Sequence, residues 1–211
     1  MGQEVQGYHL WEYFVKGGVC MYPLLLCSIA AVAVAIYKAW QFARLTLTAD
    51  PLVEQIEGSL RSGNAQGALE AARAYTGPMG GVARALLAKA GSSREMLRET
   101  AEVAGTHEMA HLESFLPVLQ TVGVIAPLLG FLGTVTGMIR AFMAVSVAGL
   151  GDPSVVSSGI AEALITTAYG LMIAIPTFAV YNYLVARVNS FALEMERAGG
   201  HLVALLAGGA A

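Results

Sequence analysis

Three long stretches without any charged side chain constrain the fold of this chain more than any other feature of its sequence. They are Gly17–Tyr37, Ser114–Ile139 and Ala163–Ala186. A helix of about 20 residues crosses the hydrocarbon core of a bilayer, and each stretch is long enough to do so. With 56% hydrophobic and 13% charged residues, the 211-residue chain is also more apolar than soluble domains are. The sequence therefore predicts an all-α membrane protein with three transmembrane helices and long cytoplasmic extensions.

The distribution of basic residues predicts which side of the membrane each end faces. Only Lys16 precedes the first stretch, and no Lys or Arg occurs between Ala141 and Thr166. The basic residues Arg44, Arg61, Arg73, Arg84, Lys89, Arg94 and Arg98 all lie between the first two stretches. Loops rich in Lys and Arg stay in the cytoplasm. We therefore expect an outside N-terminus, a cytoplasmic loop and a cytoplasmic C-terminus.

Together these patterns divide the chain into seven segments. They are an outside, interfacial tail (1–16), transmembrane helix 1 (17–43), a cytoplasmic helical loop domain (44–113), transmembrane helix 2 (114–145), a short outside connection (146–158), transmembrane helix 3 (159–186) and a cytoplasmic tail (187–211). The net charge of −3, without a basic cluster, argues against nucleic acid as a partner. Membrane lipid is an expected partner instead.

Local signals predict where the helices of the loop begin and end. Asp50 and Pro51 supply an N-cap followed by a proline at the first helical position. Ser92–Glu95 reads as a capping box, and the sequence has no strong breaker before Pro117. We therefore expect one helix to run from this box into the second span. Lys38 is expected at headgroup depth.

The sequence HEMAH at His107–His111 matches the pattern of zinc proteases. Such a site needs His107 and His111 on one helical face, Glu108 as general base, and a third protein ligand. Glu113 diverges on the same helix, and no further motif supplies the third ligand. We favour a polar helix just below the membrane, with no metal or other cofactor, and keep a membrane zinc metalloprotease as the alternative.

The second and third spans are rich in small residues that suit close helix packing. Gly133 and Gly137 form a GxxxG pair. Pro127 and Pro176 lie inside the spans, where each frees a backbone carbonyl that neighbouring helices must satisfy. These four residues are predicted to shape the contact between the two spans.

Two ionisable residues accompany hydroxyl groups within these spans. Arg140 lies late in span two and Glu162 early in span three, and the hydroxyl groups belong to Thr134, Thr136, Thr166 and Thr167. Counting about 1.5 Å per residue, a shared level for Thr134 and Thr167 brings Arg140 and Glu162 to nearly one level too. Such tiers suit a proton path. Two structural alternatives stay open, namely threonine bonds to their own helices and an Arg140–Glu162 ion pair.

Two segments of these spans resemble a known family. They are APLLGFLGTVTGMI (Ala126–Ile139) and IAEALITTAYGLMIAIPTFAVYN (Ile160–Asn182). They resemble the ExbB/TolQ group of the MotA/TolQ/ExbB proton-channel family, over about Leu112 to Asn189. The resemblance implies a multi-pass protein of the bacterial inner membrane whose outer side is the periplasm. It also implies a homopentamer around a central pore, without enzymatic activity.

The resemblance further implies partners and site residues. The pore would enclose two copies of an ExbD- or TolR-like single-span protein that carries a transmembrane Asp. A TonB- or TolA-like protein would receive the mechanical work. Thr134 and Thr167 match the family's pore threonines and Glu162 its span-three glutamate. Arg140 falls where sequences of the family vary, so its role as a pore-edge or structural charge rests on the depth comparison.

Overall fold

The computed structural model describes residues 10–148 and 153–208, and every regular element within these ranges is an α-helix. This confirms the expected all-α class. The described chain divides into two compact units. One contains the residues up to Ile36 together with 115–182, and the other contains 37–114 together with the residues from Tyr183 onward. Each unit is described by itself.

The first unit contains helix α1 (Leu10–Lys16), most of α2 (Met21–Ala43), α7 (Leu116–Ala148) and the first half of α8 (Pro153–Gly208). Among the described residues, α2, α7 and α8 are the three helices long and apolar enough to cross a membrane. The prediction of three membrane-spanning helices is therefore confirmed. Pro127 and Pro176 lie inside α7 and α8, and both helices continue through them.

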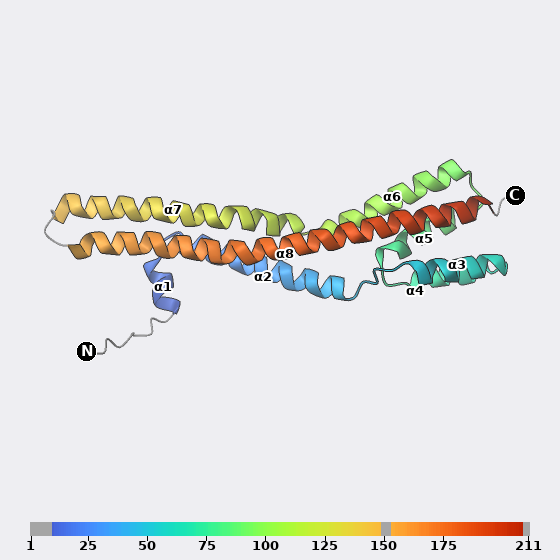
Figure 1. The fold of residues 1–211 in the computed structure, drawn as a ribbon, viewed down its shortest axis with the longest axis horizontal. Coiled ribbons are helices and arrows are strands. Elements are labelled where there is room, and N and C mark those ends of the chain that lie inside the picture. The colour runs from blue at the N-terminus through green and yellow to red at the C-terminus, as the bar shows by residue number, and fades with distance from the viewer. Residues whose placement is uncertain (1–9, 149–152, 209–211) are drawn as a thin grey trace. The chain divides into compact units, whose positions relative to one another are not determined.

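A small apolar core holds this unit together. Met21 and Leu24 of α2 pack with Ala126 of α7 and Ala174 of α8, and all four are nearly inaccessible. Figure 1 shows α7 running beside the first part of α8. Most other apolar side chains of these helices are exposed, as expected where lipid or another chain covers them.

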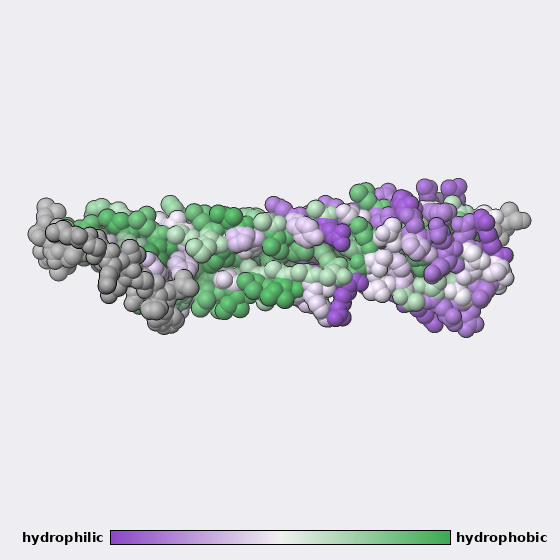
Figure 2. Space-filling model, turned by 60° about the horizontal axis from the view of Figure 1, so that its bottom comes forward, coloured by the Kyte–Doolittle hydropathy of each residue, from purple (hydrophilic) through white to green (hydrophobic). Residues whose placement is uncertain are grey.

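The second unit contains α3 (Asp50–Arg61), α4 (Ala65–Ala74), α5 (Pro78–Ala88) and α6 (Arg94–Glu113), packed against the C-terminal part of α8. Its core includes Ile56, Leu86, Leu97 and Leu202, all fully buried. Figure 2 shows hydrophilic residues gathered on the surface of this unit, whereas the described surface of the first unit is mostly hydrophobic. The second unit therefore has the more polar surface of the two.

The expected continuous helix from the capping box into span two is wrong. Helix α6 ends at Glu113, and Phe115 has a φ of 64°, a left-handed conformation that interrupts the helix before α7 begins at Leu116. The carbonyl groups freed by this break find other donors. The hydroxyl of Ser114 donates to the His111 carbonyl at 2.7 Å, which compensates part of the interruption.

Two predicted N-caps are also shifted by one residue. Ser93, not Ser92, caps α6, and its Oγ accepts the Met96 N–H at 3.3 Å. At α3, Ala49 occupies the N-cap position and Asp50 is already helical. The reason at α3 is a tertiary contact, because the Ala49 N–H donates to the Glu194 carboxylate of α8 at 2.7 Å.

One predicted boundary does not coincide with a helix end. Helix α8 is continuous from Pro153 to Gly208, so the third span and the C-terminal tail share one helix. The predicted connection at 146–158 overlaps the ends of α7 and α8, and its residues 149–152 lie outside the described residues. Of the predicted tail at 1–16, residues 1–9 likewise lie outside them.

Candidate functional site: the contact between α7 and α8

Small residues bring the backbones of α7 and α8 close together. A Cβ placed on Gly137 would lie 2.7 Å from the Gly159 carbonyl oxygen, and one on Gly170 would lie 2.6 Å from the Ala126 carbonyl oxygen. Gly133 is buried against Thr166 in the same way. Separations under 3.0 Å leave no room for a side chain, so glycine permits this approach.

The threonine hydroxyl groups of this contact all have carbonyl partners. Thr167 Oγ1 lies 3.1 Å from the Ala163 carbonyl in its own helix and 3.2 Å from the Gly130 carbonyl of α7. Thr134 donates to Phe131 at 2.6 Å, and Thr136 donates to Gly133 at 3.1 Å, both within α7. Thr167 is thus the hydroxyl that joins the two helices at this level.

The structure gives the relative levels of Thr134 and Thr167, for which the sequence predicted one shared level. Thr167 lies opposite Gly130, which precedes Thr134 by one helical turn, or about 6 Å. Both threonines are half-buried. The structure therefore does not place the two hydroxyl groups directly opposite each other, because Thr134 lies one turn further along α7 than the residue that Thr167 contacts.

Arg140 and Glu162 form an ion pair between α7 and α8. Arg140 Nη1 lies 2.8 Å from Glu162 Oε1 and 3.0 Å from Oε2. The Glu162 side chain is 13% exposed, compared with 52% for Arg140. An ion pair of this kind lowers the free-energy cost of a charge in an apolar layer. The Arg140–Glu162 ion pair, which the sequence left open as a structural alternative, is therefore present within one chain.

The HEMAH segment lies on α6 in the second unit, whereas Arg140, Glu162 and the threonines of the α7–α8 contact belong to the first unit. His107 and His111 are exposed, and the Glu108 carboxylate packs over Gly81 of α5. Among the described residues there is no group of three or more His, Cys, Asp and Glu side chains placed to hold a metal ion. The motif therefore lacks a third ligand within this part of the chain, and the alternative of a zinc protease gains no support.

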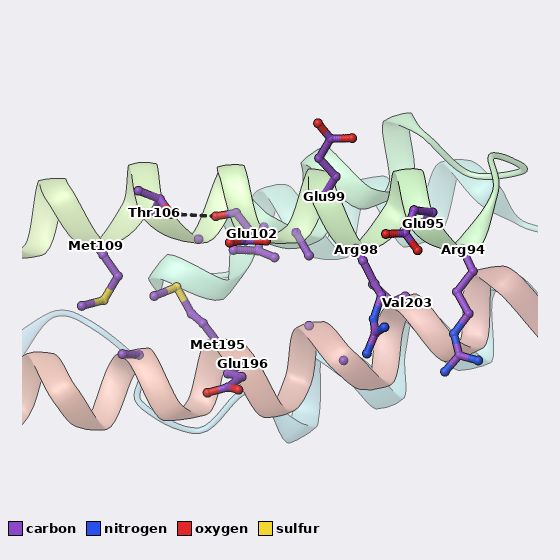
Figure 3. A pocket seen from close by; sticks show the side chains of 16 residues that line it. Arg94, Glu95, Arg98, Glu99, Glu102, Thr106, Met109, Met195, Glu196 and Val203 are labelled. Carbon is purple, nitrogen blue, oxygen red and sulfur yellow. Dashed lines mark hydrogen bonds between the residues drawn. The ribbon is translucent and has the colours of Figure 1, made fainter.

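A groove of about 920 Å³ lies in the second unit between α6 and the C-terminal part of α8. Figure 3 shows Arg94 and Arg98 reaching from α6 toward α8, whereas Glu99 points away from it. The residues that line the groove include no Cys or His, and their one hydroxyl, on Thr106, donates to the Glu102 carbonyl of its own helix. Among the described residues, the carboxylates of this lining do not form a group placed to hold a metal ion.

Sequence reasoning missed Lys38. Its side chain is fully buried in the second unit, a position that the sequence did not indicate. Its ammonium donates to the Leu112 carbonyl at 2.9 Å, to Gln41 Oε1 at 2.9 Å and to Ser114 Oγ at 3.2 Å. Lys38 thus caps the end of α6. Leu112 is 74 residues away in the chain, and no local pattern could have indicated this contact.

A second missed cluster joins α3 to α8. Arg197 donates to Glu194 Oε1 at 2.9 Å and to Asp50 Oδ1 at 2.5 Å. The hydrogen bond from Arg197, together with that from the Ala49 N–H, holds the pKa of Glu194 below its usual value despite partial burial. Burial, and the nearby Glu194 charge, raise the pKa of Tyr75. The cluster therefore fixes the start of α3.

These features describe a polytopic helical membrane protein with a glycine-lined contact between two spans and polar groups inside it. A model of the MotA/TolQ/ExbB proton channel family matches residues 74–197, which include α6, α7 and most of α8. This is more than half of the chain, and the chain belongs to the MotA/TolQ/ExbB proton channel family.

Individual relatives agree with this assignment. The chain is 37% identical over 180 residues to the biopolymer transport protein ExbB-like 1 of Synechocystis sp., which covers 84% of this chain and 71% of that protein. It is 33% identical over 189 residues to the ExbB-like 3 protein of the same organism, covering 88% and 90%. It is 47% identical over 88 residues to the Tol-Pal system protein TolQ of Haemophilus influenzae, covering 42% and 39%. The resemblance to the ExbB/TolQ group is therefore confirmed.

Proposed function

We propose that this chain is the pore-forming stator subunit of a motor driven by the proton-motive force in the bacterial inner membrane. Membership of a proton channel family whose ExbB members are described as biopolymer transport proteins supports this function. The observation that carries it at the residue level is Thr167, whose hydroxyl lies within 3.2 Å of the Gly130 carbonyl at the contact between two spans. The proposed role is proton conduction and force transmission rather than enzymatic catalysis.

The proposed assembly is a homopentamer around a central pore. Helices α7 and α8 expose apolar side chains besides those in their mutual contact, among them Phe131, Phe142, Leu164 and Ile175. In a membrane such faces contact lipid or neighbouring subunits. Five copies would bury part of these faces and surround a space lined by α7 and α8, with α2 forming the outer ring.

A second protein is needed in this scheme to carry the proton. Between residues 114 and 186 the acidic residues are Asp152 and Glu162, and Glu162 is paired with Arg140. The chain thus contributes hydroxyl groups and one paired acid to its spans. We propose that two copies of an ExbD- or TolR-like single-span protein supply an Asp that binds and releases protons beside Thr134 and Thr167, and that a TonB- or TolA-like protein receives the work.

The membrane potential provides enough energy for such a step. Moving one charge across the membrane gains about 2.3 kcal/mol per 100 mV. The proposed orientation, with a periplasmic N-terminus and a cytoplasmic loop, follows from the basic residues between the first two spans. In this orientation Glu162 and Arg140 lie near the periplasmic side, where Glu162 would tune or relay protons that enter.

Removal of the Thr167 hydroxyl tests the proposed path. In the complex purified from its own membranes and reconstituted into phospholipid vesicles, proton influx under an imposed potential is read with an enclosed pH-sensitive dye. We expect Thr167→Val to reduce this influx on the order of 100-fold, the lower range for removal of one proton-transfer group. Thr167→Ser, which keeps a hydroxyl, should retain most of it.

Thr177→Val is the matched control. Thr177 is a buried threonine of the same helix, and its hydroxyl donates to the Ile173 carbonyl of α8. We expect this variant to conduct normally. Normal influx in Thr167→Val, or an equal loss in both valine variants, would contradict a role for Thr167 in the proton path.

A further inference from the structure

The turn between α1 and α2 lies against the Glu162 side chain. Gly18 has a φ of 71°, and a Cβ placed on it would lie 2.7 Å from Glu162 Cδ and 3.3 Å from Cγ, with Oε1 closer still. The carboxylate thus occupies the space that any other side chain at position 18 would take. Two separate reasons therefore favour glycine at position 18. The backbone is left-handed there, and the carboxylate leaves no room for a side chain.

A second contact fastens the same turn to α8. Thr166 is fully buried, and its Oγ1 lies 3.0 Å from the Gly17 carbonyl oxygen and 2.6 Å from the Glu162 carbonyl oxygen. The Gly17 N–H donates to the Tyr13 carbonyl at 2.9 Å. The turn is therefore held at both its N–H and its carbonyl group, one helical turn along α8 from Glu162.

Arg140 contacts the same carboxylate through both of its oxygen atoms, at 2.8 and 3.0 Å. A glutamate side chain has three rotatable bonds, and ordering it opposes folding unless neighbours restrict its alternatives. Here the turn restricts them, and only 13% of the side chain is exposed. The turn therefore holds the carboxylate where Arg140 can reach it.

We propose that the Gly17–Gly18 turn is a positioning element for Glu162, with Gly18 and Thr166 as the positioning residues. The turn contacts the carboxylate and restricts it to positions near Arg140. The hydrogen bond from Thr166 to Gly17 holds the turn in place. Through this contact the segment before the first span controls the environment of the acid in the third span. Its consequence for proton conduction rests on the proposed function, whereas the positioning itself does not.

The positioning is tested by spectroscopy on the purified full chain. Glutamate labelled with ¹³C at the carboxyl group gives an infrared carboxylate band, which the difference from Glu162→Gln assigns to Glu162. We expect Gly18→Ala to shift this band because the added methyl displaces the carboxylate from Arg140. Gly63→Ala is the matched control, because Gly63 also has a φ of 71° but a Cβ there would meet nothing within 4 Å.

Thr166→Val provides a second route that adds no left-handed strain, and it keeps the test valid if Gly18→Ala does not fold. It removes the hydroxyl that holds Gly17 and should shift the same band, whereas Thr177→Val should not. An unshifted Glu162 band in a folded Gly18→Ala or Thr166→Val variant would overturn the proposal. A shift of equal size in the control variants would overturn it as well.

The link to conduction is tested separately by combining variants in the vesicle assay. We expect Gly18→Ala to lose most proton influx, and to cause no further loss when added to Glu162→Gln. Independent, additive losses would contradict action through Glu162. If Glu162→Gln conducts normally, the role of Glu162 in the proposed function fails, while the infrared result still decides the positioning.

Discussion

At the scale of single residues, two charged side chains complete helix ends that their own helices leave open. The Lys38 ammonium donates to the Leu112 carbonyl near the end of α6. The Glu194 carboxylate accepts the Ala49 N–H at the start of α3. The end groups of a helix require such partners when they are buried. Within the described residues no buried side-chain nitrogen or oxygen lacks a hydrogen bond.

The charge of Glu194 should make the stability of the chain depend on pH. Its pKa is lowered in the fold, mainly by the Arg197 hydrogen bond. A group of this kind contributes stability above its unfolded pKa, and the contribution disappears as the pH falls through the folded pKa. We expect Glu194→Gln to lower the free energy of unfolding at neutral pH by about 1 kcal/mol. In thermal unfolding scans the difference from the natural chain should vanish in acid.

The neighbouring Glu196 serves as the control for this pH effect. It is exposed on the same helix. Glu196→Gln should unfold at the temperature of the natural chain across the pH range. A difference for Glu194→Gln that stayed constant into acid would show that its charge is not the cause.

At the break between α6 and α7, a glycine variant should be more stable than an alanine variant. Inside a helix the order of stability should be reversed. Phe115 has a φ of 64°, where a side chain adds strain that glycine avoids. Phe115→Gly should therefore be more stable than Phe115→Ala by about 1 kcal/mol. At Val103, an exposed position inside α6, glycine should instead be less stable than alanine by about 1 kcal/mol. Thermal unfolding of the four variants measures both differences, and the same sign at both positions would refute this explanation of the break.

At the scale of elements, the contact of α7 with α8 depends on close backbone approach. Apolar side chains gain little from leaving lipid for another apolar surface, so spans associate through packing and hydrogen bonds. Glycine at positions 130, 137, 159 and 170 supplies the packing, and Thr167 supplies a hydrogen-bond donor. Removing either contribution should affect the pairing of these two helices.

Gly170 tests this packing most sharply. A Cβ on Gly170 would lie 2.6 Å from the Ala126 carbonyl oxygen, which belongs to helix backbone and cannot move independently. We expect Gly170→Ala to destabilise the folded chain by about 1–3 kcal/mol through overpacking. Gly105→Ala, where a Cβ meets nothing within 4 Å in α6, should stabilise it by up to about 1 kcal/mol. Thermal unfolding in detergent compares them, and a neutral Gly170→Ala would contradict the importance of the close approach.

At the scale of the whole molecule, the sequence predicted what depends on local composition. The charge-free stretches predicted the three apolar helices, because helices satisfy their backbone within their own segment. The break at Phe115 was missed, although Pro117 follows it closely, because the contacts that support the break involve Lys38, which is distant in the sequence. The contact of Gly18 with Glu162 joins positions 144 residues apart. Contacts of this kind depend on the final packing and leave no local pattern.

The central claim, that this chain is one subunit of a proton-driven motor, is tested most directly by native mass spectrometry. The complex should be purified gently from its own membranes, so that its natural partner remains bound. The account predicts five copies of this chain together with two copies of a single-span protein. A lone chain or a dimer carrying one zinc ion per chain would contradict it and would return attention to His107, Glu108 and His111.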